Sequence, residues 1–270
     1  MELQKYKKKQ YGTAGSGIEN LIIFAISFNT DKKRDNMLTI EHISKHYGDK
    51  TAVNDLSLHI APGEIYGFIG PNGAGKTTTI KACCGLLPFE EGEIRINGIS
   101  IKEDPLACKK LLAYLPDNPD LYEFMTGIQY LNFIGDIFGI PSDIRQERIR
   151  RYTDAFSLTG DLAQPISAYS HGMKQKLAVT SALIHEPKLF IMDEPFVGLD
   201  PKAAHLLKGF MREFCGYGGA IFFSTHVLEV AEKLCDKIAI IQNGKLRRSG
   251  TMEEVKGDES LENVFLEMEG

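Results

Sequence analysis

The stretch Gly70-Pro71-Asn72-Gly73-Ala74-Gly75-Lys76-Thr77-Thr78 follows the pattern G-x-x-x-x-G-K-[ST], which is typical of a phosphate-binding loop. The apolar residues 65–69 before it predict a buried strand, and residues 76–84 after it predict a helix. Glycine lets the backbone approach phosphate oxygens, and a helix N-terminus supplies positive potential. We therefore predict that Lys76 reaches the outer phosphates of a nucleoside triphosphate and that Thr77 places its hydroxyl on Mg²⁺. The alternative is a glycine-rich turn that matches by chance.

The composition is that of a globular protein, since 43% of the 270 residues are hydrophobic and 25% are charged. A formal net charge of -5 lacks the basic footprint of nucleic-acid-binding proteins, so no nucleic-acid partner is expected. The apolar stretch at residues 21–28 is far too short to span a bilayer. The cysteines have neither metal-binding spacing nor a disulfide pattern, which favours reduced thiols and a cytosolic chain. They are Cys83, Cys84, Cys108, Cys215 and Cys235.

The chain divides into three regions by pattern. Residues 1–36 carry a basic run and a stretch of small residues, and we interpret them as an extension outside the working domain. A secretion signal is disfavoured because no small-residue cleavage site follows Phe28. Residues 37–250 form the predicted domain, with a mainly helical subdomain inserted at about residues 106–185. Residues 251–270 predict a short helical tail that ends in one amphipathic helix.

Strand patterns surround the phosphate-binding loop, and a strand–helix alternation returns after the helical insert. Before the insert, apolar and polar residues alternate as in half-buried strands. After it, the strands are almost wholly apolar and are separated by helices, which predicts a parallel sheet with right-handed crossovers. The predicted strands are residues 38–43, 52–60, 94–96, 189–192, 220–223 and 238–241.

Two carboxylates follow the apolar strand predicted at residues 189–192. Asp193 is in position to hold Mg²⁺ through a water, and Glu194 to polarise an attacking water. The alternative is a pair of exposed acids at the end of a strand. The phosphate-binding loop earlier in the chain favours the interpretation as a nucleotide site.

The segment Tyr169-Ser170-His171-Gly172-Met173-Lys174-Gln175-Lys176 opens the last helix of the insert. A serine and a glycine at a helix start form an anion-binding site, here without a lysine in the turn itself. An ordinary serine cap of the helix explains the same pattern.

The order of these motifs resembles the ATP-binding cassette (ABC) ATPase of transporters. The likeness covers about residues 38–250 and includes Val197-Gly198-Leu199-Asp200-Pro201 and Ser224-Thr225-His226. It implies an α/β fold: a P-loop NTPase core with a parallel sheet, an antiparallel β subdomain and a helical insert. It also implies that the chain binds ATP with Mg²⁺ and hydrolyses it to ADP and phosphate, with Gly70 to Thr78 holding the phosphates.

The resemblance implies roles for further residues, and each has a plainer alternative. Tyr47 is expected to stack on adenine, or else to pack a turn. Ser170 and Gly172 are expected to contact the γ-phosphate bound by a second subunit. Asp200 is expected at the seam between the two subunits, although an N-cap role accounts for it too. His226 is expected to contact the γ-phosphate and to orient the water with Glu194, or else to be a polar residue at a helix start.

The chain departs from the family pattern at two places. The family has a glutamine at the start of the helical insert, where this chain has Asp117, which can face Mg²⁺ or a water but is shorter and negative. The signature Leu-Ser-Gly-Gly-Gln appears here as residues 169–173, with only the serine and the second glycine kept. Both departures resemble the export-type, ABC-2-like subfamily that is linked to multidrug, antibiotic, lipid or polysaccharide export.

The resemblance implies two partners. One is a second ABC ATPase, identical or related, which docks head to tail so that ATP closes the dimer and hydrolysis reopens it. The other is a separate membrane-spanning permease, which places the chain in the cytoplasm on the inner face of the cell membrane and carries the substrate specificity. A soluble repair or translation ATPase is a less favoured alternative, because the two nucleotide motifs are close together and one cassette is present. A non-hydrolysing binding module is disfavoured because Glu194 and His226 are both present.

Overall fold

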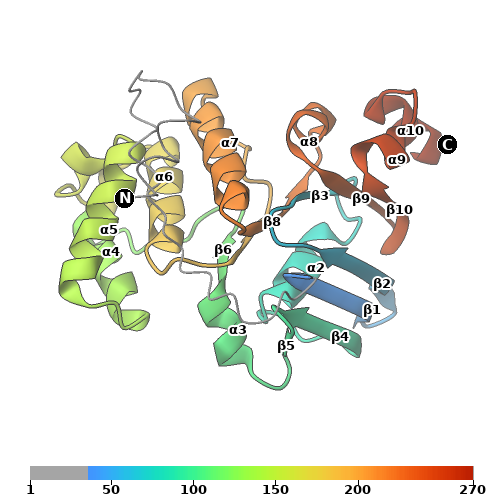
Figure 1. Ribbon diagram of the computed structural model, residues 1–270, viewed down its shortest axis with the longest axis horizontal. Helices are drawn as coiled ribbons and strands as arrows, with labels where there is room; N and C mark the ends of the chain where they lie inside the picture. The colour runs from blue at the N-terminus through green and yellow to red at the C-terminus, as the bar shows by residue number, and fades with distance from the viewer. Residues whose placement is uncertain (1–35, 270) are drawn as a thin grey trace, which may run out of the picture.

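The strand β3 (Ile65–Ile69), which leads into the phosphate-binding loop, lies inside a six-stranded sheet. The computed structural model of the chain describes residues 36–269 (Figure 1). The strand order is β10-β9-β3-β8-β7-β6; all neighbours are parallel except β10, which is antiparallel at the edge. The other five strands of this sheet are β6 (Leu112–Leu115), β7 (Leu189–Met192), β8 (Ala220–Thr225), β9 (Lys237–Gln242) and β10 (Lys245–Thr251). The predicted parallel sheet is thus confirmed.

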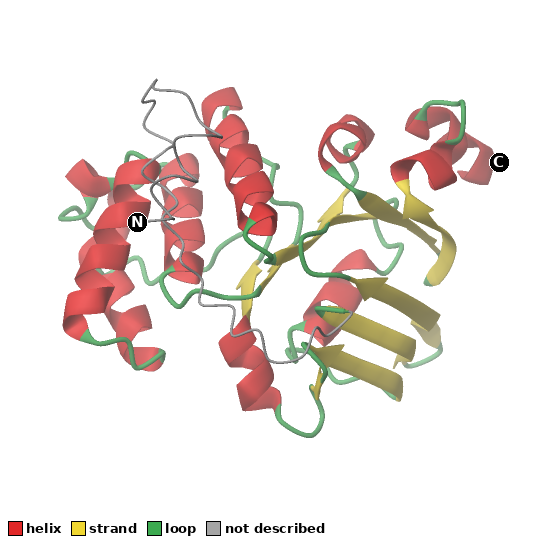
Figure 2. Cartoon of the chain, viewed as in Figure 1, coloured by secondary structure: helices red, strands yellow, loops and turns green. Residues whose placement is uncertain are grey.

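A second, antiparallel sheet holds the β-like segments from either side of the phosphate-binding loop. Its order is β2-β1-β4-β5, and Figure 2 shows it as a separate layer from the six-stranded sheet. Its strands are β1 (Leu38–Tyr47), β2 (Lys50–Ile60), β4 (Glu91–Ile96) and β5 (Ile99–Ser100). The turn between β4 and β5 contains Asn97 and Gly98, both with positive φ, as the Asn-Gly pair predicts. The α/β architecture with two kinds of sheet is therefore as the resemblance implied.

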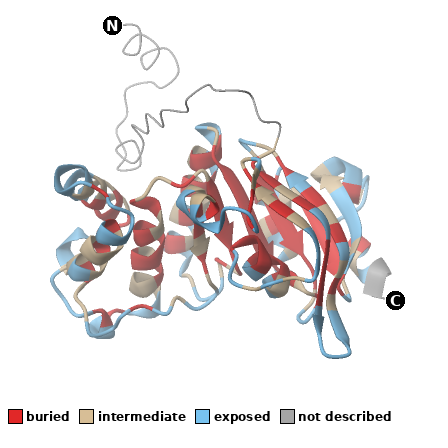
Figure 3. Ribbon diagram, turned by 90° about the horizontal axis from the view of Figure 1, so that it is seen from below, coloured by how far each residue is buried: buried red, intermediate tan, exposed pale blue. Residues whose placement is uncertain are grey.

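β3 is buried on both of its faces because two cores meet at it. Ile65 and Ile69 pack into the cluster that includes the helical insert, whereas Tyr66 and Phe68 pack into the cluster beneath the antiparallel sheet. The helix α2 (Lys76–Cys83) lies between the two sheets (Figure 1). Buried residues, red in Figure 3, run through the centre of the molecule between exposed surfaces. The phosphate-binding loop therefore stands on a strand and a helix that are both fixed by packing.

Three helices form an arm at the left of Figure 1: α4 (Gly127–Ile137), α5 (Ser142–Ala155) and α6 (His171–Leu183). α4 begins with a capping box: the Thr126 side chain accepts from the backbone of Gln129, and the Gln129 side chain accepts from the backbone of Thr126. Arg145 of α5 donates to Asp136 of α4 at 2.6 Å. The capping box stabilises the start of α4, and the Arg145–Asp136 bond joins α5 to α4.

One strand falls inside the segment that was predicted as mainly helical. Residues 112–115 follow the short helix α3 (Pro105–Leu111) and form β6, which pairs in parallel with β7 at the edge of the sheet. Residues 111–115 are all apolar and cross the boundary between α3 and β6, so the hydrophobic pattern does not show where the helix ends. Pairing with β7 supplies the backbone hydrogen bonds and overrides the local pattern. As a result, Pro116 and Asp117 emerge at the edge of the sheet where Asp193 also lies.

The remaining helices are α7 (Pro201–Gly216), beside α6 in Figure 1, and a group on the right of that view. This group holds α8 (Leu228–Leu234), α9 (Met252–Lys256) and α10 (Leu261–Glu269). The C-terminal tail ends in the predicted helix as α10, and it is preceded by α9, which begins with a capping box of Thr251 and Glu254. No helix within residues 36–269 is both long and apolar enough to cross a membrane. The predicted N-terminal extension, residues 1–36, lies outside the described residues apart from Asn36.

Candidate functional site

A cavity of about 590 Å³ opens beside the phosphate-binding loop. It brings together the loop, the aromatic residue at the end of β1, the segment after β6 and the two carboxylates after β7. Its lining residues are Tyr47, Lys50, Ala52, Pro71, Asn72, Gly73, Gly75, Lys76, Thr77, Thr78, Lys81, Tyr114, Pro116, Asp117, Asn118, Asp193 and Glu194. Most of the predicted site residues therefore share one cavity, although they come from four separate parts of the chain.

The glycines of the phosphate-binding loop serve two different purposes. Gly73 has a φ of +79°, and a Cβ added to it would meet nothing within 4 Å, so its backbone faces open space. A Cβ on Gly75 would lie 2.4 Å from the carbonyl oxygen of Ala52 in β2, and one on Gly70 would lie 2.4 Å from that of Ile241 in β9. Gly73 thus leaves room for a ligand, whereas the other two let the loop pack against both sheets.

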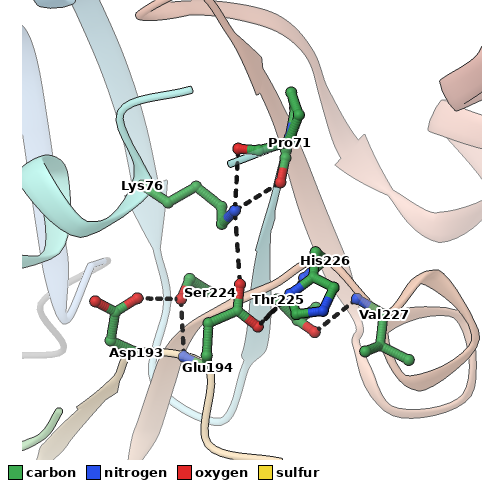
Figure 4. A network of polar contacts seen from close by, with 9 residues as sticks. Pro71, Lys76, Asp193, Glu194, Ser224, Thr225, His226 and Val227 are labelled. Carbon is green, nitrogen blue, oxygen red and sulfur yellow. Dashed lines mark hydrogen bonds and ion pairs between the residues drawn. The ribbon is translucent and has the colours of Figure 1, made fainter. Parts of the chain in front are cut away.

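Lys76 lies across the floor of the cavity. Its Nζ donates to the carbonyl oxygens of Gly70 at 2.6 Å and Pro71 at 3.2 Å, and it lies 3.5 Å from Oε1 of Glu194 (Figure 4). Only 7% of the Lys76 side chain is exposed, so its charge is poorly hydrated and is balanced by these oxygens. The ammonium group is therefore ready to exchange these partners for phosphate oxygens.

Asp193 is buried and is held by a residue that sequence reasoning missed. Ser224, near the end of β8, donates from Oγ to Oδ1 of Asp193 at 2.5 Å and accepts from the backbone N–H of Glu194 at 3.0 Å (Figure 4). β7 and β8 are neighbours in the sheet, which brings Ser224 beside the two acids. The motif Ser224-Thr225-His226 predicts a role for His226 only. The local sequence does not indicate that Ser224 connects Asp193 to the backbone of Glu194.

Glu194 and His226 form a second contact at the same edge. His226 Nδ1 lies 3.0 Å from Oε2 of Glu194, and the His226 backbone N–H donates to the same oxygen at 3.3 Å. Glu194 has a φ of +48°, which is uncommon for a residue with a side chain. His226 directly precedes Val227, which is the N-cap of α8. His226 thus lies at the start of α8 and also contacts Glu194.

Asp117 lines the cavity, and Tyr114 stands near it on β6. Burial raises the pKa of the Tyr114 phenol well above its usual value, and the negative charges of Asp193 and then Asp117 add to the rise. The phenol therefore keeps its proton and remains a hydrogen-bond donor. Tyr114, Lys81 and Lys50 were not predicted as site residues. The sequence around Tyr114 predicts helix, which gives no reason to place it at the site, and the two lysines have the pattern of ordinary surface charges.

The donor set of the cavity suits Mg²⁺. Thr77 offers a hydroxyl, and Asp193 and Asp117 offer carboxylate oxygens, which are the ligands that Mg²⁺ prefers. No group of three or more His, Cys, Asp or Glu residues between residues 36 and 269 forms a metal site by itself. Mg²⁺ commonly binds through one or two carboxylates together with water and substrate phosphates, so a complete protein cage is not required.

The residues predicted to act on a second subunit lie outside the cavity. Ser170 caps α6 by accepting from the N–H of Met173 at 3.3 Å, and Asp200 caps α7 by accepting from the N–H of Ala203 at 2.9 Å. The two caps are close, because a Cβ on Gly172 would lie 3.8 Å from Oδ2 of Asp200. Neither cap nor Gly172 lines the cavity. Ser170 and Asp200 therefore both act as helix caps within the chain.

Comparisons with known proteins agree on one family. The family model described as "ABC transporter" matches residues 53–197. The "ABC-type transporter ATP-binding protein EcsA" of Bacillus subtilis (strain 168) is 34% identical over 238 residues, which are 86% of this chain and 96% of that protein. The "Linearmycin resistance ATP-binding protein LnrL" of the same organism is 35% identical over 215 residues, 80% of this chain and 69% of that protein.

A solved structure titled "Structure of ATP binding subunit of ABC transporter" shares 34% sequence identity. It matches with a TM-score of 0.83 and covers 87% of this chain and 100% of that chain. Fold, motif order and sequence identity therefore lead to the same assignment. The chain belongs to the ABC transporter family, as an ATP-binding subunit.

Proposed function

We propose that the chain hydrolyses ATP to ADP and phosphate and that this reaction drives export through a separate membrane protein. The observation that carries the proposal is that Glu194 contacts both Lys76 and His226 beside the phosphate-binding loop. A cation for phosphate, a carboxylate for water and an imidazole are joined within hydrogen-bond or ion-pair distance. A module that only bound ATP would not need the last two groups.

Glu194 is the proposed general base. Its carboxylate accepts a proton from water while the water oxygen attacks the γ-phosphorus and the bond to the β–γ bridging oxygen breaks, which releases ADP. His226 fixes Oε2 of Glu194 from two sides, through its ring and its backbone N–H. Ser224 fixes the backbone of the same residue and the carboxylate of Asp193. The base is thereby held by neighbours before the substrate arrives.

Lys76 and the backbone of the phosphate-binding loop bind the phosphates, and Tyr47 offers a ring for the adenine at the outer end of the cavity. Mg²⁺, when bound through Thr77 and Asp193, would neutralise charge on the phosphate oxygens. Asp117 brings a further negative charge to the same wall. It lies within the cavity, so it is proposed to face the metal or its waters rather than the phosphates directly.

A second copy completes the proposed site. Ser170 and Gly172 lie at the start of α6, outside the cavity that holds Lys76. In this proposal, the phosphate-binding loop and the α6 start that contact one ATP therefore come from two different chains. Two chains docked head to tail would place the α6 start of one against the cavity of the other. Binding of ATP would then close the dimer, and loss of the γ-phosphate would let it open.

A membrane partner is proposed to dock where the segment after Asp117 ends in exposed aromatic rings. Phe124 is 82% exposed and lies beside Tyr122, whose ring also contacts Phe133 of α4. Glu123, between them, pairs with Lys174 of α6. A partner seated on these rings would therefore connect to the cavity through the Asp117 segment and to the signature through α6. This location would place the chain on the inner face of the cell membrane.

The likeness to a linearmycin resistance protein supports a drug-like molecule as the proposed exported substrate, with the specificity in the membrane partner. The test compares ATP turnover and ATP-dependent dimer formation in the full chain and in Glu194→Gln. We expect turnover to fall by at least about a hundredfold while ATP-dependent dimers accumulate. Equal turnover would contradict the assignment of the base. Turnover by a strictly monomeric chain would contradict the two-copy site.

A further inference from the structure

Lys45 is a buried lysine that the proposed reaction does not use. It is part of β1, and only 10% of its side chain is exposed. Its Nζ donates to Oε1 of Glu90 at 2.6 Å, and Glu90 lies in the loop that connects α2 to β4. A buried ammonium group is costly to desolvate, and an apolar side chain would fill this position more simply. Packing alone therefore does not explain why a charged side chain occupies this position.

The buried ammonium group of Lys45 lies over the ring of Tyr47. Lys45 and Tyr47 are two residues apart in β1, and the Lys45 Nζ lies 5.4 Å from the centroid of the Tyr47 ring. This distance is within the range of a cation–π contact. Tyr47 lines the cavity and Lys45 does not, so the cation contacts a lining residue without being one itself.

Glu90 fixes this arrangement from several directions. Its Oε2 accepts from the backbone N–H of His46 at 3.0 Å, and its own N–H donates to the carbonyl oxygen of Ser44 at 3.1 Å. The bond from Lys45, and then that from His46, hold the pKa of Glu90 below its usual value. One carboxylate thus ties the backbone immediately before Tyr47 to the loop that leaves α2. The end of β1 is anchored although the Tyr47 side chain itself is half exposed.

We propose that Lys45 and Glu90 are positioning residues that orient Tyr47 and polarise its ring for stacking on the nucleobase. The inference rests on the proposed role of Tyr47 as the base-stacking residue. The ammonium group draws electron density toward one face of the ring, so the other face becomes a better partner for an electron-rich purine. The pair also limits the rotation of a ring that is otherwise exposed to solvent. Both effects act on the base and leave the phosphates untouched.

The test uses two ligands that the chain does not turn over, ADP and inorganic pyrophosphate, each with the same Mg²⁺ concentration. Both engage the phosphate-binding loop, but only ADP carries a base. We expect Lys45→Met to weaken ADP binding about three- to fivefold and to leave pyrophosphate binding unchanged. Lys45→Arg restores most of the ADP affinity. In steady-state turnover, Lys45→Met raises KM for ATP while kcat is preserved.

Three further variants separate the explanations. Lys102→Met is the matched control, since Lys102 Nζ lies 4.3 Å from the centroid of the Phe89 ring and does not line the cavity. It leaves both affinities unchanged. Glu90→Gln keeps an acceptor for His46 but removes the carboxylate charge that holds the Lys45 ammonium group in place. It therefore reduces ADP affinity alone, even if Lys45→Met does not fold. In a Tyr47→Ala background, Lys45→Met has no further effect on ADP binding.

Unchanged ADP affinity in Lys45→Met would overturn the inference, and so would an equal loss for ADP and pyrophosphate in Glu90→Gln. Tyr47→Ala tests the underlying base site separately, with an expected loss of about tenfold for ADP alone. If that loss is seen while Lys45→Met and Glu90→Gln bind ADP normally, the positioning role fails and the base site stands. If Tyr47→Ala binds ADP normally, the base site fails and the positioning role fails with it.

Discussion

The Nζ of Lys76 lies 3.5 Å from Oε1 of Glu194, so the proposed phosphate-binding cation and the proposed general base are in contact across the cavity. Phosphate oxygens and the Glu194 carboxylate therefore compete for the same ammonium group. When phosphate takes the cation, Glu194 is left with His226 and with water. The contact thus links occupation of the phosphate site to release of the base.

This competition predicts that Glu194→Gln binds ATP more tightly than the unaltered chain. The amide is neutral, so it holds Lys76 less strongly and no longer repels the phosphates. We expect the Kd for ATP, measured by equilibrium titration before turnover, to fall several-fold. Glu259→Gln, an exposed acid on the C-terminal segment, serves as the control and leaves Kd unchanged. Weaker binding in Glu194→Gln would contradict the competition.

Ser224→Ala removes the bridge between Asp193 and the Glu194 backbone. We expect a loss of about 1–3 kcal/mol in the free energy of unfolding, because Asp193 remains buried without that donor. ATP turnover should fall at least tenfold as the two acids lose their alignment. Ser100→Ala is the matched control, since Ser100 is equally buried and donates to Glu93 at 2.7 Å, away from the cavity. It should lose similar stability, seen in urea melts, and retain turnover; a parallel loss of turnover would refute the alignment role.

Asp117→Gln replaces a negative side chain in the cavity by a longer, neutral one. We expect KM for ATP to fall several-fold at low salt, because the net negative charge of the cavity falls by one while the Gln amide oxygen can still face Mg²⁺ or its waters. The difference should shrink as ionic strength rises, since salt screens the exposed carboxylate. Asp120→Asn, three residues further and not a lining residue, should leave KM and its salt dependence unchanged. A salt-independent effect of Asp117→Gln would point to the length of the side chain rather than its charge.

Ser170→Asp separates the cap of α6 from the proposed contact with the second ATP. Aspartate caps a helix as well as serine does, so we expect Tm to stay within about 2 °C. The added charge would face the γ-phosphate held by the partner copy. ATP-dependent dimers, measured by elution volume in the Glu194→Gln background, should therefore disappear. Ser170→Asn keeps the cap without the charge and should still dimerise; dimers of Ser170→Asp would exclude this contact.

Glu213 on α7 should make stability depend on pH. Its Oε2 is buried without a hydrogen-bond partner among residues 36–269, and burial raises its pKa from 4.5 to about 7. The folded chain therefore binds more protons than the unfolded chain between these values, so stability falls as pH rises from 4.5 to 7. Because the side chain is partly exposed, we expect about 1 kcal/mol, or about 2–4 °C in Tm, from Glu213→Gln at pH 8. The variant should give no such gain at pH 4.

Local sequence was sufficient for the phosphate-binding loop and for the two acids after β7. A loop of this kind binds phosphate through its own backbone and the helix that follows, so its pattern is written in consecutive residues. The same holds for Asp193 and Glu194, which directly follow a buried strand. The capping residues Thr126, Ser170 and Asp200 were likewise readable, because a cap and its target lie three residues apart.

The tertiary structure decided the contacts between segments that are far apart in the chain. β6 formed because β7 offered a parallel neighbour, and Tyr114 entered the cavity only as a consequence. Ser224 reached Asp193 because β7 and β8 are adjacent in the sheet. Glu90 reached Lys45 beneath Tyr47 because β1 and β4 pair. Such contacts depend on which strands become neighbours, and that choice is made by the packing of the whole chain rather than by any one stretch of it.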